Sequence, residues 1–179
     1  QVSSIDGFRV FTRDWFFFWQ VAAWHSLNDL YASGAEPRTV NVYVGLEEAR
    51  PRLRRNALLH LMSGVMSVLQ QTGVALLNAH TAVAAETSLA LSVAGPRPPT
   101  LWSKGGLKEG DVLIMTKPLG TGVLLQALMS GALPHSSWAP LRDALLTAHD
   151  RFLKIAASWE VHASTDVSSF GLVGHFGEV

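Results

Sequence analysis

The residues at the end of the chain have the types and spacing expected of a phosphate or metal site. Asp166 stands in a Thr-Asp-Val-Ser sequence, directly after the predicted strand Glu160–Ser164. A glycine-spaced segment follows (Gly171, Gly174, Gly177) and predicts the start of a helix. A carboxylate can hold Mg²⁺, and small residues let backbone approach a phosphate closely. The pattern indicates phosphate chemistry, although an acid in this position, taken alone, is more often a turn or helix-capping residue.

A second polar turn lies upstream, between another predicted strand and helix. It spans residues 116–122 with the sequence Thr-Lys-Pro-Leu-Gly-Thr-Gly. Lys117 could neutralise phosphate charge, but it precedes the glycines, so the turn does not match the phosphate-binding P-loop pattern. A surface lysine beside a Pro-Leu-Gly turn explains it equally well. We therefore assign no catalytic role to Lys117.

Hydrophobic periodicity predicts the elements that must position these residues. Alternating apolar residues predict strands, and apolar residues three or four apart predict helices. The predicted strands are Val2–Phe11, Thr39–Gly45, Val74–Leu77, Ser88–Ala94, Asp111–Met115 and Glu160–Ser164, and the predicted helices are 15–33, Arg52–Thr72, Gly122–Met129 and Leu141–Trp159. Prolines at 96, 98 and 99 predict a boundary between domains 1–97 and 98–179. The mixed order favours an α+β fold or an α/β sandwich.

Composition excludes some functions and leaves others open. Apolar residues make up 48% of the 179 residues, and the 14 basic residues balance the 14 acidic ones. Such a balance gives no support to a nucleic-acid partner. The absence of cysteine rules out a thiol nucleophile within these residues and is compatible with a cytoplasmic protein. The apolar run Trp15–Trp24 is too short to span a bilayer, so we expect no membrane partner.

The same run is rich in aromatic residues. They are Trp15, Phe16, Phe17, Phe18, Trp19 and Trp24. Such residues are most simply core or interface residues, because an aromatic cluster on one helix often marks a contact surface. We therefore expect the chain to self-associate.

Several motifs in order resemble one family. They are Ser3–Phe8, Ala22–Pro37, Gly73–Thr81, the Thr-Lys-Pro-Leu-Gly-Thr-Gly turn and the Thr-Asp-Val-Ser-Ser-Phe-Gly-Leu-Val-Gly-His-Phe-Gly-Glu-Val end. Together they resemble selenophosphate synthetase (selenide, water dikinase), of the aminoimidazole ribonucleotide synthetase-like superfamily. The resemblance extends along nearly the whole chain, and both ends look cut from a longer protein.

The resemblance implies a fold and an activity. The fold would be α+β and aminoimidazole ribonucleotide synthetase-like, with an N-terminal α/β sandwich domain whose sheet forms between subunits of a homodimer. Part of a second α/β domain would follow. The parent protein would use ATP and Mg²⁺ to convert selenide to selenophosphate, with release of AMP and phosphate.

The resemblance also implies site residues. Positions matching Asp6 and Asp29 contact ATP in the family, and so do those matching Ala79, His80 and Thr81, the last three from the partner subunit. Positions matching Asp29 and Asp166 bind metal. Taken singly, Asp29 is more often an ordinary exposed helix acid, and a lone histidine such as His80 is more often structural. No residue is assigned as catalytic.

The chain also departs from the family pattern. His25 replaces an asparagine, Asn78 and Ala79 replace a Gly-Gly pair, and Ser169 replaces a glycine. The family segment that carries a cysteine or selenocysteine nucleophile and a lysine would lie ahead of residue 1. We therefore expect the 179 residues alone to be inactive.

Two further interpretations stay open. The chain could belong to another ATP-dependent synthetase of the superfamily, such as the ring-closing enzyme of purine synthesis. The lost glycines and His25 instead favour a catalytically inactive dimerisation or regulatory module, of the kind that a fusion to a flavin-dependent oxidoreductase could contain. The Thr-Lys-Pro-Leu-Gly and Gly-His-Phe-Gly-Glu runs favour the selenide branch.

Overall fold

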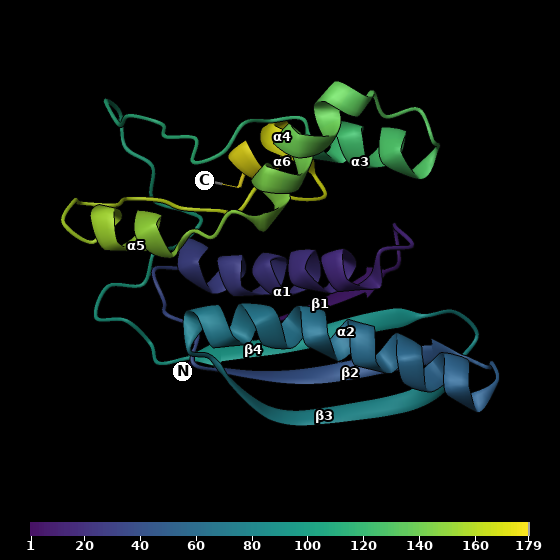
Figure 1. The fold of residues 1–179 in the computed structure, drawn as a ribbon. Coiled ribbons are helices and arrows are strands. Elements are labelled where there is room, and N and C mark those ends of the chain that lie inside the picture. Colours follow the sequence, from purple (N-terminus) through teal and green to yellow (C-terminus); the bar gives the residue numbers. More distant parts are fainter. Residues whose placement is uncertain (179) are drawn as a thin grey trace.

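A computed structural model describes residues 1–178, and its first half is a four-stranded sheet with two helices on one face (Figure 1). The elements are β1 (Val2–Arg9), α1 (Trp15–Ala32), β2 (Thr39–Glu47), α2 (Pro51–Thr72), β3 (Ala75–Ala84) and β4 (Ser88–Gly95). The strand order is β1-β4-β2-β3, antiparallel except for the parallel β2–β3 pair. The α+β class expected from the sequence is confirmed.

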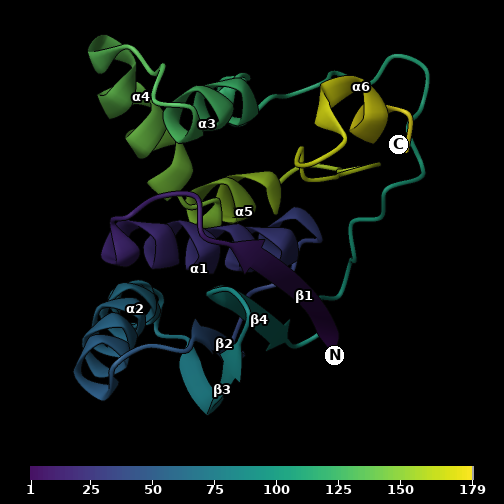
Figure 2. The ribbon, with the colours of Figure 1, turned by 90° about the vertical axis from the view of Figure 1, so that its right-hand side faces the viewer.

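The aromatic run forms the centre of the core and not a contact surface. Phe17, Phe18, Trp19 and Trp24 are buried, and among the six aromatic residues only Phe16 is exposed. Helix α1 lies between the sheet with α2 on one side and the C-terminal helices on the other (Figures 1 and 2). A helix covered on both sides is apolar on most of its surface. The aromatic run therefore gives no support to the self-association expected from an exposed aromatic patch.

The second half consists of short helices. They are α3 (Thr121–Met129), α4 (His135–Leu146), α5 (Asp150–Ala156) and α6 (Gly171–Phe176). Of these, α4 and α5 pack on α1. The single helix predicted over Leu141–Trp159 is wrong, because Thr147 turns to an extended conformation and ends α4. The backbone N–H of His149 then donates to the Asn28 side chain of α1, at 3.1 Å. The helix is therefore broken at this tertiary contact, although the apolar pattern of the sequence continues past it.

Three strand predictions need correction. Residues 111–115 and 160–164 are extended but form no strand, since neither has a strand partner among the described residues; Val112 is 83% exposed and Ile114 71%. The strand predicted at Val74–Leu77 is longer than expected, because β3 extends over Ala75–Ala84. β3 is an edge strand and continues through residue 84 because β2 pairs with it along its length.

The remaining elements agree with the predictions to within about two residues. Gly73 ends α2 in the left-handed conformation, with φ of 70°. A residue with a Cβ pays a steric cost in this conformation, whereas glycine does not. No helix in residues 1–178 combines the length and the apolarity needed to cross a bilayer.

Candidate functional site

The first strand and the first helix bring several polar side chains together. Ser4, Asp6 and Phe8 alternate along β1 on its less exposed face, which α1 contacts. Ser4 Oγ donates a 2.7 Å hydrogen bond to Asp29 Oδ2. The Phe8 ring meets the His25 ring edge-on, with centroids 5.3 Å apart. Strand residues two apart share a face, and so do helix residues four apart. The β1–α1 contact therefore places the alternating side chains of β1 opposite His25 and Asp29 of α1.

The centre of this contact is a possible metal site. Among the described residues, Asp6, His25 and Asp29 offer ligand atoms that all lie within 4.8 Å of one another. Asp6 Oδ2 is buried and has no hydrogen-bond partner there. A buried carboxylate oxygen without a partner is costly, and a bound cation is one way to satisfy it. The three side chains therefore fit a divalent cation.

Asp29 carries the electrostatic signature of such a site. Burial raises the pKa of Asp29 to about 6, the nearby Asp6 charge adds to the rise, and the hydrogen bond from Ser4 opposes it. Two carboxylates in a partly buried site repel each other unless a cation or a proton lies between them. Asp6 and Asp29, both predicted as ATP contacts, are thus adjacent.

Asp166 lies close enough for its charge to raise the pKa of Asp29 further. Its oxygens are not in the three-residue cluster, so its metal role remains a prediction. The capping alternative finds no support, because Phe170 is the N-cap residue of α6 and no side chain of residues 1–178 caps that helix.

A chain of polar contacts holds the segment around Asp166. Lys104 Nζ lies 2.8 Å from Glu178 Oε2, and the same oxygen is 3.2 Å from Nδ1 of the buried His175. His175 Nε2 lies 3.3 Å from Ser168 Oγ. The bond to Glu178 is the main cause of the raised pKa of Lys104, and the charges of Asp166 and Asp29 add to it. Sequence reasoning missed Lys104, which no motif contains.

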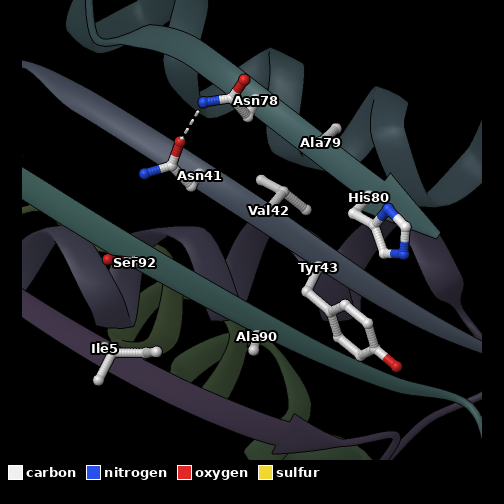
Figure 3. A pocket seen from close by; sticks show the side chains of 9 residues that line it. All are labelled: Ile5, Asn41, Val42, Tyr43, Asn78, Ala79, His80, Ala90 and Ser92. Carbon is white, nitrogen blue, oxygen red and sulfur yellow. Dashed lines mark hydrogen bonds between the residues drawn. The ribbon is translucent and has the colours of Figure 1, made fainter. Parts of the chain in front are cut away.

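The predicted Ala79–Thr81 contacts lie elsewhere. All three residues are exposed on β3. Figure 3 shows His80 on the open face of the sheet, beside Tyr43, with the helices behind. The two rings are stacked, with centroids 6.1 Å apart. Within one chain, His80 therefore faces away from the Asp6–His25–Asp29 cluster.

The Thr116–Gly122 turn is tied to α1 near the cluster. Thr116 Oγ1 lies 2.8 Å from His149 Nε2, and the His149 backbone bonds Asn28, the neighbour of Asp29. Burial lowers the pKa of Lys117 to about 8 and that of His149 to about 4, the latter helped by the Lys117 charge. The predicted second polar turn is thus linked, through His149, to the helix that carries Asp29.

Comparison with known families accounts for both halves of the chain. The family model "AIR synthase related protein, N-terminal domain" matches residues 1–96, and the corresponding C-terminal domain matches residues 108–179. The chain belongs to the AIR synthase related protein family. The expected aminoimidazole ribonucleotide synthetase-like fold is therefore confirmed.

Relatives of this AIR synthase related chain include proteins named selenide, water dikinase. The one from Pelobacter propionicus is 33% identical over 180 residues, and the one from Carboxydothermus hydrogenoformans is 31% identical over 179. Each match covers 99% of this chain and 51% of the relative. The chain thus spans about half the length of the curated relatives that it matches.

Solved structures with the AIR synthase-like fold include thiamine-monophosphate kinase from Stenotrophomonas maltophilia (TM-score 0.78, 22% identity, covering 99% of this chain and 58% of that one). The hydrogenase maturation protein HypE superposes with a TM-score of 0.81 at 18% identity, over 98% of this chain and 56% of that one. At these identities the similarity shows the fold alone.

Proposed function

We propose that the chain is part of a selenide, water dikinase that uses ATP to make selenophosphate, releasing AMP and phosphate. The names of its relatives support this substrate, and one geometric observation supports the chemistry. Asp6, His25 and Asp29 converge at the β1–α1 contact, with a buried oxygen of Asp6 left unpaired. Phosphoryl transfer depends on cations that neutralise phosphate oxygens, and this cluster is the place to hold one.

The residues of the chain would share the work as follows. Asp6 and Asp29 supply carboxylate oxygens, and Asp166 adds negative charge nearby. A bound divalent cation, Mg²⁺ by the family resemblance, offsets charge on the phosphates of ATP. Lys104, held by Glu178, adds a positive charge beside Asp166 that can orient a phosphate.

A homodimer would complete this site. His80 lies on the open face of the sheet, away from Asp6 and Asp29 in the same chain. The family resemblance implies that the partner of a homodimer supplies the position of His80 to the site. The hollow on the open face is lined by apolar and uncharged polar side chains, such as Ile5, Tyr43 and Asn78, which suit contact with another sheet.

ATP binding tests the proposed function. We expect calorimetry to show tighter ATP binding with Mg²⁺ than without it, and Asp166→Asn to remove at least about half of that gain in free energy. The matched control is Asp143→Asn, which neutralises an exposed acid paired with Arg142. If the wild-type chain binds no ATP under either condition, the inactive dimerisation module replaces this proposal.

The dimer has its own test. We expect the wild-type chain to sediment as a dimer at tens of micromolar (an order-of-magnitude choice, because weak interfaces dissociate below it). Ile5 is 74% exposed on the open face, so a charge there should oppose the packing of a second copy. We therefore expect Ile5→Lys to shift the chain to monomer. Leu59→Lys, on the exposed side of α2, should leave the dimer intact. A wild-type monomer at this concentration would contradict the dimer.

A further inference from the structure

The donor set at the β1–α1 contact contains a nitrogen. His25 and Asp29 are one helical turn apart on α1, and Asp6 faces them from β1. Each offers one ligand atom, and these three atoms lie within 4.8 Å of one another. The set is therefore one imidazole and two carboxylates, converging from two elements that pack directly on each other.

The surroundings of His25 and Asp29 hold these two donors in place. The Phe8 ring packs edge-on against His25, with an interplanar angle of 85°. Ser4 occupies one oxygen of Asp29, which orients the carboxylate and leaves the other oxygen free of that bond. Asp6 Oδ2 is buried with no hydrogen-bond partner among the described residues. Partners such as Phe8 and Ser4, which lie outside the ligand set, orient ligands and raise metal affinity.

We propose that this site selects a nitrogen-accepting divalent transition metal ion, of the class of Mn²⁺, Co²⁺ or Zn²⁺, in preference to Mg²⁺. Mg²⁺ prefers oxygen ligands and water, whereas imidazole suits transition metals. Three protein ligands leave coordination positions open for phosphate or water oxygens. The inference deepens the proposed function, since it names the metal class of the same site, but metal selection can be measured without ATP.

Cobalt is the probe, because its visible absorption reports nitrogen ligation and coordination number. Titrating the full chain with Co²⁺ should give one site that Zn²⁺ displaces and a roughly hundredfold excess of Mg²⁺ does not. His25→Asn, which introduces the residue type that the family resemblance places there, should weaken Co²⁺ binding at least about tenfold and alter the spectrum. Mg²⁺ affinity should change little.

Matched variants make the result decisive. His80→Asn removes an exposed imidazole from the open sheet face and should leave Co²⁺ binding unchanged. Asp6→Asn gives a second test on another element if His25→Asn fails to fold, and it should weaken Co²⁺ binding similarly. The proposal is overturned if Mg²⁺ displaces Co²⁺ at comparable concentration, or if a folded His25→Asn keeps the wild-type affinity and spectrum.

The outcome is separable from that of the proposed function. Loss of ATP binding in a chain that still binds Co²⁺ through His25 would overturn the ATP-dependent activity and leave the metal selection standing. Mg²⁺-dependent ATP binding that His25→Asn leaves unchanged, in a chain with no Co²⁺ site, would overturn the metal selection and leave the proposed function standing.

Discussion

Gly64→Ala is expected to destabilise the protein by about 2 kcal/mol or more, even though alanine is the better helix former by about 1 kcal/mol. Gly64 lies in α2, where that helix crosses α1. A Cβ at this position would lie 2.5 Å from the Phe16 carbonyl oxygen and 2.9 Å from Trp19 Cβ. The first contact is with backbone, so relief requires the two helices to separate and the core beneath them to loosen.

Urea unfolding measures this effect, with Ser63→Ala as the matched control. Ser63 is the preceding residue, and within residues 1–178 its exposed hydroxyl bonds only the Leu59 carbonyl one turn back. Its replacement should change the unfolding free energy by no more than about 0.5 kcal/mol. A Gly64→Ala protein as stable as the wild type would show that the α1–α2 contact is looser than described.

Asp29→Asn is expected to abolish the metal-dependent part of ATP binding, at least about tenfold in affinity, while making the metal-free protein more stable. The variant removes a ligand charge but keeps an acceptor for Ser4. The stability gain follows from the raised pKa of Asp29, which shows that the folded protein disfavours the ionised side chain. Improved stability with lost function is typical of residues kept for binding.

The raised pKa of Asp29 makes the stability difference between Asp29→Asn and the wild type depend on pH. Because the pKa of Asp29 is raised from 3.8 to about 6 on folding, its contribution to stability is present below pH 3.8 and is lost as pH rises through 6. The Asn variant lacks that loss, so it should exceed the wild type by about 1 kcal/mol above pH 6, after solvent screening. The two should converge near pH 4. A variant less stable than wild type at pH 7.5, or one with an intact Mg²⁺ effect, would contradict the assignment.

The sequence predicted most of the N-terminal elements because their patterns are local. Alternation marked β1, β2 and β4, and Gly73 marked the end of α2. β3 was misjudged because its residues carry no inward-outward alternation: it is an edge strand, exposed along most of its length. The extended residues 111–115 have a strand-like pattern, but a pattern cannot supply a neighbouring strand.

The candidate site was predicted only in part, for a similar reason. Asp6 and Asp29 were identified by motif, but their contact depends on how α1 rotates over β1, which no local pattern specifies. His25 was considered only as a departure from the family. The four-residue spacing of His25 and Asp29 was the available signal, since it puts both on one helix face. Lys104 and Glu178 are 74 residues apart and meet through tertiary structure alone.

The position of β1 in the sheet sets the order in which the site can form. β1 pairs only with β4 among the described strands, joining Val2 to Gly95 across almost the whole N-terminal half. We expect such long-range pairing to close late in folding, because loop-closure entropy opposes it until the intervening elements are in place. Asp6 enters the cluster only at that step. Edge strands are also among the first elements to open in native-state fluctuations, so brief fraying of β1 would disassemble the ligand set while α1, α2 and the other strands stay folded. Exchange of a bound ion would then be timed by the motion of a single strand.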